Sequence, residues 1–264
     1  QLSFNAVHNF THQLPESYLR SKGLEGYHDW DPRTEEYYEW YKAGRKPNNP
    51  EGREHYLGQL YYLDKTIGEV IDYLKEQGLQ RRTMIVFISD NGGSTPIYAR
   101  NYPLRGSKYV LYEGGIRVPM IIAYPGEYPE GRVSDNLVSA LDIMPTIVSE
   151  AGCEIPENID GIDLGPLLQG EDPGLQHKAL FWDTRQETAA RSGNYKLRTA
   201  IDDANARYEM VELELGEFLY DLEQDIGERV NLKDSLPQTY RELEREFNNW
   251  KVRVHGKPPK HLND

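Results

Sequence analysis

The stretch "TMIVFISDNGGS", residues 83–94, decides how the fold is interpreted. Up to Ile88 it is an almost continuous apolar and β-branched run, which is typical of a strand covered on both faces in a parallel sheet. Directly after Ser89 the chain turns polar, with Asp90 and Asn91. Ligands of open α/β sheets bind just beyond the carboxyl ends of the strands, and these two side chains offer hard oxygen atoms. The pattern is compatible with a calcium or magnesium site, although a simple turn is the commoner explanation for these residues alone.

Helical and extended segments surround this stretch in a regular order. Between about Glu51 and Gln77, apolar residues recur three and four positions apart, and Gly78 follows as a helix cap. The run "VPMIIAY" from Val118 predicts a second buried strand, and "LSFNAVH" predicts another that ends at His8. These segments predict an α/β protein with a mixed, mainly parallel sheet that is flanked by helices.

The sequence pattern changes from about His177. The segments "ALFWDT", "TAARSGNYKLRTA" and "EFLYDLEQD" are short strands separated by turn residues, so they predict a small antiparallel sheet. A long final helix from about Pro237 has an apolar face in the three-and-four rhythm. We therefore divide the chain into a larger part, residues 1–176, and a smaller α+β part, residues 177–264.

Composition excludes some classes of protein. The net charge is −13, and no basic stripe is present, which argues against nucleic-acid binding. The longest apolar runs have the length of strands, so we predict no membrane span. The single cysteine, Cys153, excludes a disulfide within the chain. Because Gln1 is not an initiator methionine, we expect the chain to be the remainder of a longer protein.

Several segments, taken in order, resemble the formylglycine-dependent sulfatases of the alkaline phosphatase superfamily. They are "FNAVH", "YLDKTIGEVIDYL", "GLQRRTMIVFISDNGG", "PLRGSKYVLYEGGIRVPMII", "LVSALDIMPTIVSEAG" and "DGIDLGPLLQG", followed by "HKALFW", "AARSGNYKL" and "LYDLEQDIGERVNL". The resemblance implies an alkaline-phosphatase-like fold. Residues 1–176 would then be the C-terminal part of the catalytic domain, and residues 177–264 the smaller subdomain.

The resemblance also implies roles for individual residues. Asp90 and Asn91 match two ligands of a calcium ion, for which magnesium is a weaker candidate. Lys108 matches the lysine that contacts the substrate sulfate, and His8 matches the histidine near the sulfate and the leaving oxygen. The segment after that histidine, "NFTHQLP", is longer than usual and contains His12. Of the two histidines, we favour His8 as the contact to the sulfate.

Two arginines in the loop between the strands, Arg105 and Arg117, have weaker claims to such roles. We expect them to be structural ion-pair partners.

The nucleophile of the family is not encoded here. It is a cysteine or serine in a Cys/Ser-x-Pro-x-Arg motif, converted to formylglycine, and the sequence contains no such motif. Cys153 is followed by Glu, Ile and Pro and lacks the arginine. Calcium takes six to eight oxygen ligands, more than two residues supply. We expect the N-terminal half of the same protein to supply the rest, and this chain alone to be inactive.

The resulting hypothesis is a sulfatase that acts on sulfate esters of carbohydrates or small molecules. The aromatic insert, residues 26–50, could stack on sugar rings, but a solvated surface loop explains it equally well. Two alternatives remain: a phosphatase or phosphodiesterase of the same superfamily, and a non-catalytic sulfatase-like protein that binds a glycan or anion. The compartment is unknown; the resemblance alone favours an exported protein, periplasmic or secreted.

Overall fold

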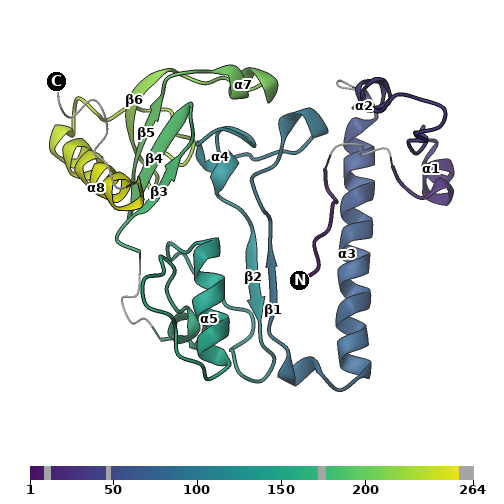
Figure 1. Cartoon of the computed structure of the whole chain (residues 1–264), viewed down its shortest axis with the longest axis horizontal. Helices are drawn as coiled ribbons and strands as arrows, with labels where there is room; N and C mark the ends of the chain where they lie inside the picture. The colour runs from purple at the N-terminus through teal and green to yellow at the C-terminus, as the bar shows by residue number, and fades with distance from the viewer. Residues whose placement is uncertain (9–12, 46–48, 172–176, 256–264) are drawn as a thin grey trace. The chain divides into compact units, whose positions relative to one another are not determined.

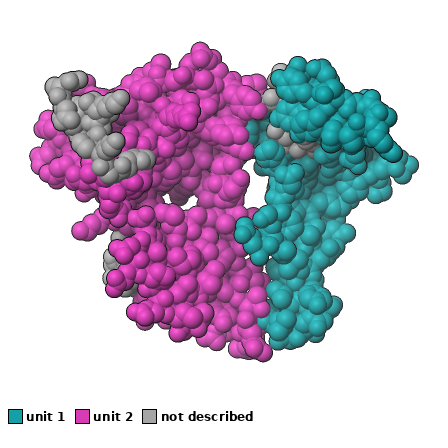
Figure 2. Space-filling view, in the orientation of Figure 1, with its two compact units in different colours: residues 1–80, 93–100 teal, residues 81–92, 101–264 magenta. Residues whose placement is uncertain are grey.

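The computed structural model describes residues 1–8, 13–45, 49–171 and 177–255. They form two compact units, coloured separately in Figure 2. Unit 1 contains residues 1–80 and 93–100, and unit 2 contains residues 81–92 and 101–264. The boundary that we predict near residue 176 lies within unit 2 and stays a prediction.

Unit 1 is helical (Figure 1), with α1 (Glu16–Lys22), α2 (Tyr37–Arg45), α3 (Gly52–Glu76) and the short 3-10 helix η2 (Thr95–Ile97). The prediction of the long helix is confirmed by α3. Its apolar stripe is only half-buried, and Leu60 is 43% exposed. The strand predicted at "LSFNAVH" is wrong for this structure: residues 1–8 form no strand, since none of the described strands pairs with them.

The first sheet of unit 2 has two strands, β1 (Ile85–Ile88) and β2 (Met120–Ala123). They pair antiparallel, with Ile85 opposite Ala123, and the described residues contain no parallel sheet. The expected parallel direction is therefore corrected. Apolar, β-branched composition reports burial and carries no information on strand direction. Burial is also incomplete, because β1 is half-buried and Ile121 of β2 is 61% exposed.

The second sheet confirms the small antiparallel sheet predicted after His177. Its strands, in spatial order, are β3 (Leu180–Asp183), β4 (Glu187–Ser192), β5 (Tyr195–Ala200) and β6 (Gly216–Asp221). The predicted final helix, α8 (Pro237–His255), packs on one face of this sheet. The core of this layer is Ala190, Leu197, Leu219, Tyr240, Leu243 and Phe247.

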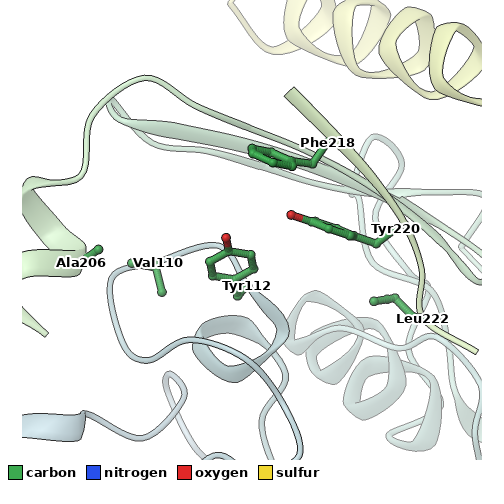
Figure 3. Close-up of a cluster of buried hydrophobic side chains, with 6 residues drawn as sticks. All are labelled: Val110, Tyr112, Ala206, Phe218, Tyr220 and Leu222. Atoms are coloured by element: carbon green, nitrogen blue, oxygen red, sulfur yellow. The ribbon is translucent and has the colours of Figure 1, made fainter. Parts of the chain in front are cut away.

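A second core contains side chains of β6 and of the loop that precedes β2. Val110 and Tyr112 come from that loop, and Phe218 and Tyr220 come from β6 (Figure 3). Ala206 of the short helix α7 (Ala204–Tyr208) completes the cluster with Leu222. The loop after Asn91 is thus partly a buried element of unit 2.

The other short elements of unit 2 are α4 (Glu113–Ile116), η3 (Ala140–Asp142), α5 (Ile143–Glu150) and α6 (Gly165–Gln169). The 3-10 helix η1 (Gln80–Arg82) begins at the last residue of the first segment of unit 1 and continues into unit 2. A capping box starts η3, with Ser139 as the N-cap and Asp142 as the reciprocal acceptor. No helix within the described residues is both long and apolar enough to cross a membrane.

Candidate functional site

The polar residues after β1 form a tight hydrogen-bonded turn. The backbone N–H of Asn91 donates to Asp90 Oδ1 at 3.0 Å, and Ser89 Oγ donates to the Asn91 carbonyl oxygen at 2.9 Å. Asn91 Nδ2 donates to the carbonyl oxygen of Gly92 at 2.8 Å. These bonds leave Asp90 Oδ2 and Asn91 Oδ1 without a hydrogen bond to the part of the chain that the structure describes. Both are hard oxygen donors of the kind that calcium prefers.

Glycines join this turn to the loop that carries Lys108. The backbone N–H of Gly92 donates to the carbonyl oxygen of Gly115 at 2.9 Å. A Cβ on Gly92 would lie 1.8 Å from the Gly114 carbonyl oxygen, and a Cβ on Gly115 would lie 2.5 Å from the carbonyl oxygen of Ser107. Only residues without a Cβ allow this approach. The turn after β1 therefore packs against the backbone next to Lys108.

Lys108 and Tyr109 are the accessible part of an otherwise buried segment. The Lys108 side chain is half-buried, with Nζ 5.0 Å from the centroid of the Tyr109 ring. Tyr109 is 52% exposed and has φ +70°, whereas residues 110–115 are buried. A bulky residue at positive φ is uncommon, and such conformations concentrate at functional sites.

Behind this loop lies a group of buried charges that sequence reasoning missed. Lys196 Nζ lies 3.0 Å from Glu113 Oε1 and 2.9 Å from Glu228 Oε1, and all three side chains are at most 1% exposed. Arg191 Nη1 lies 3.0 Å from Glu113 Oε2. Burial opposes ionisation of Glu113, but the charges of Lys196 and Arg191 outweigh it and hold its pKa below the ordinary value. Burial raises the pKa of Glu228, which has fewer cationic neighbours. A sign of these buried charges in the sequence is the acidic Glu113, which lies within the otherwise apolar stretch "VLYEGG".

The remaining candidates from the sequence are two histidines and two arginines. His8 is exposed in unit 1, and its role stays a prediction; His12 lies outside the described residues. Arg105 is confirmed as an ion-pair partner, with Nη2 3.0 Å from Glu214 Oε1, while Arg117 is exposed.

A complete metal centre is not formed by these residues alone. Within the described ranges there is no group of three or more His, Cys, Asp or Glu that could hold a metal ion. Asp90 and Asn91 have the donor chemistry for calcium, but they supply fewer ligands than the six to eight that it takes. Further ligands would have to come from other residues.

The close glycine contact gives a first prediction. We expect Gly92→Ala to lower the unfolding midpoint, with a loss of about 1–3 kcal/mol, because its methyl group would overlap the Gly114 carbonyl. Gly68→Ala is the matched control: nothing lies within 4 Å of that position on α3, and alanine favours a helix. Urea unfolding of both variants measures the difference. Equal stability of the two would contradict the packing of the turn on the loop.

Comparison with solved structures identifies the class of protein. The chain aligns with a solved structure described as "Crystal structure of Ps i-CgsB" at a TM-score of 0.70. The two are 26% identical, and the alignment covers 94% of this chain and 49% of that one. A second structure, of the same protein "in complex with k-i-k-neocarrahexaose", aligns at a TM-score of 0.66 with 29% identity, over 77% of this chain and 44% of that one. The likeness places the chain among the alkaline-phosphatase-like hydrolases.

Within this class, the chain belongs to the sulfatase family, because the sequence model described as Sulfatase matches residues 1–153. A second model, "N-sulphoglucosamine sulphohydrolase, C-terminal", matches residues 106–253. Arylsulfatase A of Bos taurus is 32% identical over 206 residues, which are 71% of this chain and 40% of that protein. A sulfatase of Formosa agariphila is 31% identical over 75% of this chain and 38% of its own length. The chain thus spans about 40% of these relatives.

Proposed function

We propose that this chain forms part of a sulfatase that hydrolyses sulfate esters of carbohydrates, and that it supplies calcium ligands and sulfate-binding residues. The nucleophile, a formylglycine, would come from an N-terminal half of the same protein, since the Cys/Ser-x-Pro-x-Arg motif is absent from this sequence. Membership of the sulfatase family supports the reaction class. The carbohydrate preference is supported by a similar protein whose structure was determined with a neocarrahexaose.

One observation supports the site more than any other: the contact of Gly92 with Gly114 and Gly115. It places the segment with the oxygen donors of Asp90 and Asn91 against the loop that carries Lys108. A sulfate ester needs cationic and hydrogen-bonding groups around its oxygens, so the proximity of an acidic turn and a lysine loop suits a bound cation beside a bound sulfate.

The roles follow from the chemistry of the side chains. Negative charge grows on the sulfuryl oxygens and on the departing oxygen when the ester bond breaks. The ammonium of Lys108 has three N–H donors that can stabilise the sulfuryl oxygens. A protonated imidazole, proposed to be that of His8, can give its proton to the departing alcohol. When bound, calcium would add Lewis-acid charge at the sulfate, held in part by Asp90 and Asn91.

The two alternatives predict different activities. A phosphatase or phosphodiesterase of the superfamily tends to use a two-metal site rich in histidine. The acid–amide turn beside a lysine loop fits a single cation better. A non-catalytic protein would keep an anion pocket without turnover.

Assays of the whole protein containing this chain distinguish these functions. We expect release of sulfate from an aryl sulfate ester, no comparable release of phosphate from the matched aryl phosphate, and loss of the activity with a calcium chelator. Preference for phosphate would favour the phosphatase. Binding of a sulfated oligosaccharide without turnover would favour the non-catalytic protein.

The metal role of Asp90 gives a second prediction. We expect Asp90→Asn to raise the calcium concentration for half-maximal activity by at least the ~10-fold that loss of an outer-shell partner already costs. The variant keeps an oxygen that can accept from the Asn91 N–H and removes one negative charge. Asp72→Asn on α3, where Asp72 pairs with Lys75 at the surface, is the control. An unchanged calcium dependence of Asp90→Asn would remove this residue from the metal site.

A further inference from the structure

We propose that Glu209 is a positioning residue for Lys108, which it holds through a hydrogen bond with Ser107. The inference rests on the proposed function, in which Lys108 contacts the sulfate. It assigns a part in substrate binding to the C-terminal portion of the chain, at a position where sequence reasoning places no functional residue.

The contact joins two residues far apart in the chain. Ser107 Oγ donates to Glu209 Oε2 at 2.5 Å, across 102 positions of sequence, and both side chains are 0% exposed. Glu209 stands directly after α7, and its backbone N–H donates to the Asn205 carbonyl oxygen at 3.0 Å. The carboxylate is therefore presented by a folded element, and Ser107 is the residue immediately before Lys108.

The same helix also holds the residue after the lysine. Asn205 Nδ2 donates to the carbonyl oxygen of Tyr109 at 3.4 Å, and the rings of Tyr109 and Tyr208 meet edge to face with centroids 6.1 Å apart. Both chain neighbours of Lys108 are thus restrained by α7 and the residue that follows it. The backbone on each side of Lys108 is therefore held by contacts with this part of the chain.

Further anchors restrain the loop on either side. Arg105 Nη1 donates to the carbonyl oxygen of Glu228 at 2.8 Å. On the other side, the backbone N–H of Leu111 donates to the Glu187 carboxylate at 3.3 Å, and that of Glu113 donates to Glu228 Oε2 at 2.6 Å. All of these partners belong to the C-terminal portion of unit 2, so that portion fixes the loop at several points.

Stability alone does not explain Glu209. Its Oε1 is buried and has no hydrogen-bond partner among the described residues. A buried carboxylate with one unsatisfied oxygen costs free energy, and such groups in folded proteins often have a functional reason. Fixing a lysine on a flexible four-carbon stem is such a reason, because displacement of a catalytic group by about 1 Å can lower a rate about 10²-fold.

The test compares Glu209→Ala with Glu209→Gln in the whole protein. We expect Glu209→Ala to lower kcat/KM for an aryl sulfate by about 10- to 10²-fold and to weaken inhibition by inorganic sulfate. Glu209→Gln keeps an oxygen that can accept from Ser107 Oγ, so it should retain both properties. Glu212→Ala, at an exposed position nearby, is the control. Kinetics are measured where urea unfolding shows each variant to be fully folded.

A double mutant separates positioning from a purely structural role. In a Lys108→Ala background, Glu209→Ala should cause no further loss of kcat/KM, because its effect passes through the lysine. If Glu209→Ala does not fold, Asn205→Ala, at a half-buried position, provides the milder test: it should give a smaller loss in the same direction.

The opposing outcomes are distinct. Lower stability with unchanged kinetics, independent losses in the double mutant, or equal losses for Glu209→Ala and Glu209→Gln would overturn the inference and leave the proposed function intact. Full activity of Lys108→Ala would instead overturn the role of Lys108, and the inference with it.

Discussion

Replacement of Lys108 by alanine in the whole protein is expected to lower kcat/KM for a sulfate ester by about 10²- to 10³-fold, the usual cost of removing one preorganised stabilising group. The ammonium would interact more strongly with the charge of the transition state than with the substrate, so the loss should appear in kcat as well as in KM. Steady-state kinetics with an aryl sulfate, and inhibition by inorganic sulfate, measure both effects.

Two further variants serve as controls for this prediction, one at a surface lysine and one at position 108 itself. Lys65→Ala removes a surface lysine of α3 whose Nζ lies 3.8 Å from Glu69, and we expect it to have no effect on turnover. Lys108→Arg keeps the charge on a longer, planar group and should retain part of the activity. If Lys108→Ala turned over substrate as fast as Lys65→Ala, Lys108 could not contact the sulfate.

The largest effect on stability is expected for Lys196→Met. This change leaves Glu113 and Glu228 buried without the ammonium between them, 3.0 Å and 2.9 Å from their carboxylate oxygens. Removing one partner of a buried ion pair typically destabilises a protein by about 3–5 kcal/mol, since an uncompensated charge stays in the interior. Urea unfolding at neutral pH measures the difference in free energy.

Two variants make this prediction specific to the buried charges. Lys233→Met removes the partner of Glu217 near the surface, where an ion pair contributes about 0–1 kcal/mol. Adding Glu228→Gln to Lys196→Met removes the carboxylate that is left without a cation, whereas Glu113 keeps Arg191 as its partner, so this double variant should restore part of the lost stability. A loss for Lys196→Met no greater than that for Lys233→Met would contradict the buried network.

The sequence predicted the long helices and the small antiparallel sheet correctly, because these elements depend on the pattern of neighbouring residues. The three-and-four spacing predicted α3 and α8, and the alternation with turn residues predicted the strands β3 to β6. The strand before Asp90 was placed correctly, yet its direction was not, because an apolar run carries no information about its partner. Helix and hairpin periods are properties of neighbouring residues, whereas strand direction depends on residues far along the chain.

The sequence pattern did not predict that charged side chains of β5 are buried. In "YKLRT" of β5, Lys196 and Arg198 alternate with apolar residues, an arrangement usually read as a solvated face. Both are 0% exposed, because the loop around Tyr112 covers that face of the sheet while α8 covers the other. Only the packed structure shows that a second layer is present.

The sequence by itself determined the family. It also gave the candidate metal-binding turn at Asp90 and Asn91 and the lysine that we expect at the sulfate, because short sequence motifs specify all three. The tertiary structure decided the antiparallel pairing of β1 with β2, the buried charges behind the lysine loop, and the contact of Ser107 with Glu209. That contact spans 102 positions of sequence, and no periodicity within one segment specifies which distant side chain will meet it.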